Sequence, residues 1–220
     1  MQKQRLKTLL SMAAILAAMA IIYFRIFPRT PRFDARPHRA LGEALAEHAA
    51  KTVGNGGRII LIAPDTSAFE YPAVELQLKA FHKALRRMKL SVGATNLIKH
   101  DPIRLARVPP EFVELLRKES EADVVVSWLG PLIPAGDQKA RLPQKHPHVV
   151  ALCSGGMPRQ INLKLLFDDG LLDVAIISRS NPPPTLPQSS NLPEWFSHFF
   201  QVVTSRNSSD LPPFPENAPR

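Results

Sequence analysis

Unbroken apolar segments alternate along this chain with segments whose apolar residues repeat at helical spacing. Five segments rich in apolar residues are bounded by Gly, Pro or charged residues, which is typical of strands buried on both faces. They are residues 58–64, 90–98, 123–129, 148–153 and 172–178. Strands of this kind occur in parallel sheets covered on both sides by helices, so the pattern predicts an α/β fold.

The segments between these strands predict helices. In residues 71–89, apolar residues recur at steps of three and four from Val74 to Met88, whereas polar residues fill most other positions. Shorter helices are expected at residues 40–53, 110–120 and 161–169. Right-handed crossovers then predict a doubly wound, mainly parallel, Rossmann-like sheet of five or six strands. The sixth is an edge strand at the end of residues 194–204.

An apolar run near the N-terminus predicts one transmembrane helix before this domain. Residues 8–24 carry no charge, and the run extends to residue 27 if Arg25 directs its charged end to the membrane surface. A helix over this segment is about 30 Å long, which matches a bilayer core. The small-x-small pattern from Ala18 to Ala20 allows a cleaved signal peptide as the alternative. We expect an uncleaved anchor, because cleavage there would leave a strongly apolar new terminus.

These features divide the chain into four parts. We expect a membrane anchor over residues 1–27, a Pro/Arg-rich linker over 28–39, the α/β domain over 40–204 and a disordered tail over 205–220. Counting basic residues on each side of the span would place the domain in the cytoplasm. A signal-anchor usually exports the domain on its C-terminal side, so we expect a single-pass protein of the inner or plasma membrane with an extracytoplasmic domain.

The charge of the chain indicates a membrane surface rather than a nucleic acid. The formal net charge is +9, and eight of the 28 Lys and Arg residues flank the apolar run. That arrangement suits anionic lipid headgroups, and the sequence has no basic stripe with interleaved aromatics and no nucleic-acid motif. We therefore expect no nucleic-acid partner. The single cysteine excludes an internal disulfide.

Polar residues follow the predicted strands at the edge where an open parallel sheet binds ligands. The candidates are Asp65, Thr66 and Ser67 after the first strand, Trp128 in the third, Ser154, Gly155 and Gly156 after the fourth, and Arg179 after the fifth. Because the carboxyl ends of parallel strands share one edge, we expect these residues to form a small-molecule site. The sequence predicts no metal site and no cofactor, since the first strand is not followed by a GxGxxG turn.

Cys153 and Arg159 have the spacing of a phosphate-binding catalytic loop. Five residues separate them after a strand, and the stretch resembles the loop of protein tyrosine phosphatases. Pro158 removes a backbone donor from that loop, and Gln160 stands where those loops usually carry Ser or Thr. We therefore expect no catalytic residue and a buried Cys153, with a thiol-dependent phosphatase-like hydrolase as the alternative.

The stretch from Ile60 to Phe69, followed by a long amphipathic helix and another strand, resembles the first lobe of type I periplasmic binding proteins of the ABC-transporter kind. Asp65, Ser67 and Phe69 match the loop that faces ligand in that family. The resemblance implies a non-catalytic module for ligand binding or protein assembly at the membrane. It also implies a second lobe, which a protein partner or a second copy of this chain would supply.

Overall fold

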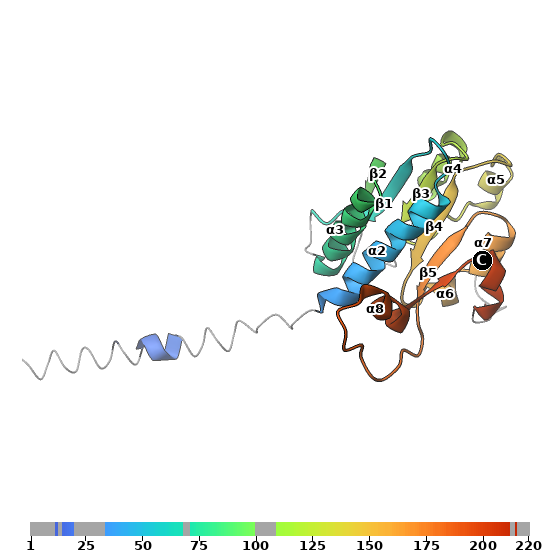
Figure 1. The fold of residues 1–220 in the computed structure, drawn as a ribbon. Coiled ribbons are helices and arrows are strands. Elements are labelled where there is room, and N and C mark those ends of the chain that lie inside the picture. The colour runs from blue at the N-terminus through green and yellow to red at the C-terminus, as the bar shows by residue number, and fades with distance from the viewer. Residues whose placement is uncertain are drawn as a thin grey trace, which may run out of the picture. The chain divides into compact units, whose positions relative to one another are not determined.

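The computed structural model describes residues 34–67, 71–99 and 109–211, together with positions 12, 15–19 and 214 (Figure 1). The chain forms two compact units, Met1–Asp34 and Ala35–Arg220. In the first unit the structure describes Met12 and 15–19, which are helical, and Asp34, which is not. Within the described ranges, no helix has the length and apolar character needed to cross a membrane. Most of the expected span over residues 8–27 lies outside those ranges, so that helix stays a prediction.

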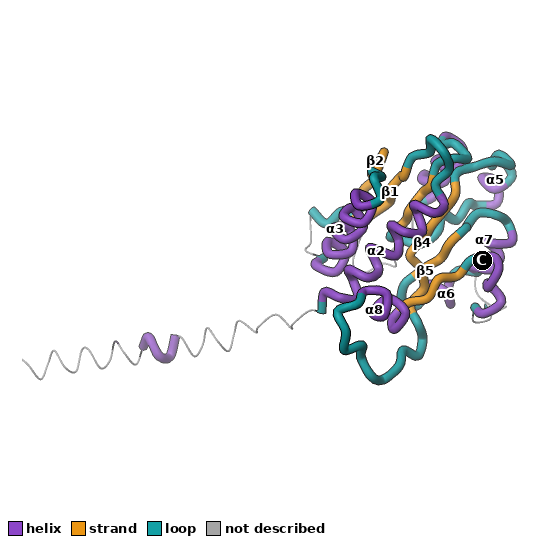
Figure 2. Tube along the Cα trace, in the orientation of Figure 1, coloured by secondary structure: helices purple, strands orange, loops and turns teal. Residues whose placement is uncertain are grey.

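The second unit is built on a six-stranded sheet with the order β2-β1-β3-β4-β5-β6. Figure 2 shows strands of this sheet in orange with helices beside them. The strands are β1 Ile59–Pro64, β2 Val92–Ile98, β3 Val124–Ser127, β4 His148–Cys153, β5 Val174–Ser178 and β6 Phe200–Val203. The first five are parallel, and β6 pairs antiparallel with β5 at the edge. The prediction of a mainly parallel sheet with a sixth edge strand is therefore confirmed.

Helices cover both faces of this sheet. The α-helices are α2 Ala35–Thr52, α3 Pro72–Arg87, α4 Leu115–Lys118, α5 Gly136–Lys139, α6 Met157–Gln160, α7 Leu163–Asp168 and α8 Leu192–Phe199, and the 3-10 helices are η1 Pro110–Glu114 and η2 Ser205–Asp210. One apolar layer packs α2, α3 and α8 on the sheet, with Leu45 and Phe81 among its buried side chains. The other layer packs η1, α4, α6 and α7, and includes the buried Leu116. Successive residues of a strand point alternately into the two layers, because side chains alternate between the two faces of a pleated strand.

The central strands form because every position suits burial on two faces. All six residues of β1 are buried, and the four residues of β3 are each 0% exposed. β-branched side chains are frequent in both strands and fill a pleated surface well. The amphipathic α3 starts with Pro72 in its first turn and is followed by Lys89, whose φ of +59° ends the helical path.

The structure corrects several expected boundaries. Helix α2 begins at Ala35 rather than residue 40, so it includes the end of the segment predicted as a linker. Between the predicted strands 123–129 and 148–153, where no helix was expected, the structure has the short helix α5. Residues 205–210, predicted as part of a disordered tail, form η2, where Ser208 is buried. Its serine and asparagine hydrogen bonds, which are local in sequence, explain why hydrophobic periodicity did not indicate it.

Candidate ligand-binding site

After β1, the described residues Asp65, Thr66 and Ser67 form a local turn. The backbone N–H of Asp65 donates to the Ile98 carbonyl over 2.8 Å, and Asp65 Oδ1 accepts from the backbone N–H of Ser67 over 2.9 Å. Hydrogen bonds from the side chain and backbone of Ser67 lower the pKa of Asp65. Thr66 is half-buried in the same turn. The candidate Phe69 lies outside the described residues.

Trp128 lies in the core at the end of β3. It is only 6% exposed, and its ring meets Phe81 edge-on, with 4.9 Å between the centroids. Its indole N–H donates to Gln77 Oε1 over 3.1 Å, and Gln77 Nε2 lies 3.1 Å from His38 Nδ1. This polar chain joins β3, α3 and α2 beneath the surface. Trp128 therefore supports the edge of the sheet instead of lining a pocket.

A cavity of about 350 Å³ opens at the carboxyl ends of β4 and β5. It is lined by Gly155, Pro158, Arg159, Ile177, Ser178, Arg179, Ser180, Asn181 and Gln201. Of the candidates from sequence, Gly155 and Arg179 line this cavity, whereas Asp65, Thr66, Ser67, Trp128, Ser154 and Gly156 do not. The structure thus divides the expected rim, because two of the eight described candidates line this cavity and the other six do not.

Backbone hydrogen bonds shape the walls of this cavity. Gly155 has a φ of +62°, which the turn after β4 requires, and its N–H donates to Ser178 Oγ over 3.4 Å. Arg179 is held by its backbone N–H, which donates to the Phe199 carbonyl over 2.8 Å, and by Nε, which donates to the Ser197 carbonyl over 2.7 Å. The end of α8, which leads into the antiparallel β6, therefore positions Arg179.

Sequence reasoning missed five residues of the cavity, which are Ile177, Ser178, Ser180, Asn181 and Gln201. Ser180 and Asn181 follow β5, at the start of the Pro/Ser-rich segment, and Gln201 comes from β6. Gln201 stands opposite Ile177 in the antiparallel register. Gln201 could have been predicted from the expected edge strand. A strand that runs antiparallel to β5 begins beside the carboxyl end of β5, so its first residues lie at that edge.

Cys153 is not placed for catalysis. Its side chain is 0% exposed, and it does not line the cavity. Burial raises the pKa of the Cys153 thiol to about 12, so the nucleophilic thiolate is scarce near neutral pH. Arg159 is exposed and lines the cavity without Cys153. The phosphatase-like alternative has no support in this geometry.

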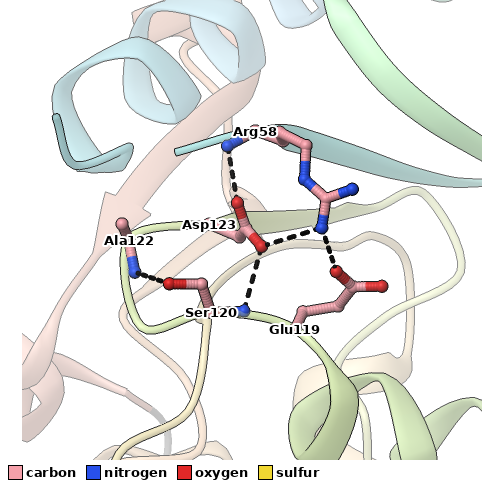
Figure 3. Close-up of polar contacts among 5 residues, drawn as sticks. All are labelled: Arg58, Glu119, Ser120, Ala122 and Asp123. Carbon is pink, nitrogen blue, oxygen red and sulfur yellow. Dashed lines mark hydrogen bonds and ion pairs between the residues drawn. The ribbon is translucent and has the colours of Figure 1, made fainter. Parts of the chain in front are cut away.

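The opposite, amino edge of the sheet holds a polar cluster with a structural role (Figure 3). Asp123 is 2% exposed and accepts hydrogen bonds from the backbone N–H groups of Arg58, over 2.6 Å, and Ser120, over 3.0 Å. The Arg58 guanidinium bridges Asp123 and Glu119. Burial alone would raise the pKa of Asp123, but these hydrogen bonds and the Arg58 charge lower it.

Within the part of the chain that the structure describes, no three His, Cys, Asp or Glu side chains are grouped to hold a metal ion. His148 Nδ1 lies 2.8 Å from Asp173 Oδ1 at the amino end of β4, away from the cavity. The fold and the cavity together define a single α/β lobe with a hollow at its carboxyl edge.

Comparisons with known proteins show a likeness in fold. No family model matches this sequence, and no curated protein matches it either. Similar solved structures include a carbohydrate transporter solute-binding protein from Agrobacterium radiobacter in complex with D-arabinose, at 14% identity and a TM-score of 0.47. An arabinose-binding protein from Geobacillus stearothermophilus has 11% identity and a TM-score of 0.48. A substrate-binding protein of a sugar ABC transport system from Bordetella parapertussis has 14% identity and a TM-score of 0.48.

The likeness extends over only part of each of these proteins. Each of these matches covers 80% of this chain, and the chain spans 60%, 63% and 58% of the three proteins, in the order given. At such low identity the likeness concerns the fold alone. The resemblance of the sequence to a single lobe of a type I periplasmic binding protein is confirmed at that level.

Proposed function

We propose that this chain is a non-catalytic ligand-binding module whose ligand occupies the cavity at the carboxyl ends of β4 and β5. The observation that carries the proposal is the position of this cavity, because open parallel sheets bind ligands beyond the carboxyl ends of their strands. Its volume of about 350 Å³ suits a small molecule. The buried Cys153 supports binding rather than thiol catalysis.

Occluding the cavity tests this function. The full chain in detergent micelles would be titrated by calorimetry with a panel of small carboxylates, inorganic phosphate and neutral monosaccharides. We expect a member of the panel to bind, and Ser180→Trp to abolish that binding by filling the cavity. Ser190→Trp places the same ring on an exposed position outside the cavity and is the matched control. Binding that survives Ser180→Trp would place the ligand elsewhere and refute the proposed site.

We also propose that residues 8–27 anchor this module in a membrane with the α/β domain extracytoplasmic. The support is the uncharged run and the basic residues on both sides of it, which suit anionic headgroups. Full-length protein should remain in the membrane pellet after alkaline carbonate extraction, whereas a variant of residues 28–220 should be released. A reporter fused after Arg220 should be active only outside the cytoplasm. Release of the full-length protein would refute the anchor.

We propose that a second copy of this chain provides a second lobe, with a different protein as the alternative. The support is that the described residues of the second unit form a single lobe with an open cavity. Sedimentation of the detergent-solubilised chain should give a dimer that becomes more stable with ligand. A chain that stays monomeric at saturating ligand would leave the different protein as the partner.

A further inference from the structure

We infer that the ligand of this cavity is a small oxyanion, a molecule whose carboxylate or phosphate group is bound between Arg159 and Arg179. This inference rests on the proposed function and adds the chemical class of the ligand. Both arginines line the cavity, and none of its nine lining residues is acidic. The cavity therefore carries two positive charges and no negative side chain to balance them. A neutral ligand would not need these charges, whereas an anion would be attracted by both.

Arg159 has no carboxylate partner within the described ranges. Among the described residues, no carboxylate forms a salt bridge with Arg159 or with Arg179. Arg58, Arg87 and Arg117, in contrast, each face a glutamate or aspartate within 3.3 Å. Two like charges lining one cavity repel each other, and an anion between them would relieve that repulsion.

Arg179 is oriented before a ligand arrives. Its Nε already donates to the Ser197 carbonyl over 2.7 Å, which holds the plane of the guanidinium. The two terminal nitrogens then provide the parallel N–H pairs that match a carboxylate or phosphate in a bidentate contact. Because this side chain is positioned by backbone atoms, less conformational entropy is lost on binding.

The remaining polar groups of the cavity are neutral and carry hydrogen-bond donors. Ser178, Ser180, Asn181 and Gln201 offer hydroxyl and amide groups around the two arginines. Such groups bind further oxygens of the anion or the rest of the ligand without opposing its charge. The volume of about 350 Å³ suits a small ligand, such as a short dicarboxylate or a small phosphate ester.

The test uses the full chain in detergent, in a buffer free of phosphate and carboxylates, with calorimetric titration of succinate, inorganic phosphate and D-arabinose. We expect succinate or phosphate to bind and D-arabinose not to bind. Arg159→Gln and Arg179→Gln should each weaken anion binding at least about tenfold, since a charge-assisted bidentate contact is lost. Arg159→Lys keeps the charge but not the bidentate geometry and should weaken binding less than Arg159→Gln.

Arg141→Gln is the matched control, because Arg141 is exposed and lies outside the cavity, and the substitution removes the same charge. Its anion affinity should equal that of the unchanged chain, and thermal unfolding of each variant checks that it is folded. Binding of D-arabinose without either anion, abolished by Ser180→Trp, would keep the proposed function and overturn the inference. Anion binding that is equal in all arginine variants would also overturn it. Absence of binding by every probe would overturn both.

Discussion

The backbone N–H of Arg58 donates a 2.6 Å hydrogen bond to Oδ1 of Asp123, a residue 65 positions further along the chain. The next residues of the two segments, Ile59 and Val124, are the first paired residues of β1 and β3. The carboxylate therefore holds the starting points of two central strands side by side. Its second oxygen, Oδ2, is satisfied by the Ser120 N–H and the Arg58 guanidinium.

Replacing this carboxylate should destabilise the domain without affecting the ligand site. Asp123→Asn keeps one acceptor but turns an amide NH₂ toward donors, so we expect a loss of about 1–3 kcal/mol in the free energy of unfolding. Urea denaturation followed by circular dichroism measures it. Glu121→Gln, which alters only an exposed salt bridge with Lys145, should change stability by less than about 0.5 kcal/mol. Equal effects of the two substitutions would contradict the anchoring role.

The lowered pKa of Asp123 also predicts a dependence of stability on pH. A carboxyl with a lower pKa in the folded state stabilises the fold above its unfolded pKa of about 3.9, and this contribution is lost as the pH falls through the folded-state pKa. Unfolding free energies measured from pH 6 to pH 2 should therefore decline more steeply for the unchanged chain than for Asp123→Asn. Parallel curves would show that Asp123 titrates alike in both states.

Gly42 should not tolerate even a methyl group. A Cβ at this position would lie 2.1 Å from the Gln77 carbonyl oxygen, where α2 packs against α3. Alanine normally favours a helix by about 0.5–1 kcal/mol over glycine, but here Gly42→Ala should cost about 1–3 kcal/mol because the helices must separate. Gly136→Ala is the control, since no atom lies within 4 Å of its Cβ. Thermal unfolding should show opposite signs for the two substitutions.

Gln77 should matter for stability although it is polar and helical. Gln77→Leu removes the acceptor of the buried Trp128 indole N–H, which loses this hydrogen bond, and also removes the contact of Gln77 Nε2 with His38. We expect a loss of about 1–3 kcal/mol in urea denaturation, together with a changed tryptophan emission. Gln188→Leu, at an exposed position, should have little effect on either measurement. A stable Gln77→Leu variant with unchanged emission would show that the polar chain contributes little.

Much of the sheet could be predicted from the sequence because β1, β3, β4 and β5 are buried on both faces. Strands of this kind appear in a sequence as continuous apolar runs. The sequence did not predict α6 or η2, because these short helices depend on local hydrogen bonds rather than on a periodic pattern of apolar residues. The general rule that ligands bind at the carboxyl edge led to Gly155 and Arg179 as candidates, and both line the cavity. It did not separate them from Asp65 and Trp128, because that separation depends on side-chain packing such as the contact between Trp128 and Phe81.

Cys153 has the sequence spacing of a nucleophile and is instead the fully buried end of a central strand. Because Cys153 is the only cysteine of the chain, its reaction with a thiol reagent reports the opening of β4. A thiol reagent at neutral pH reacts with Cys153 only during the moments when β4 is exposed to solvent. The labelling rate therefore measures how often the centre of the sheet opens, and it does so without any substitution.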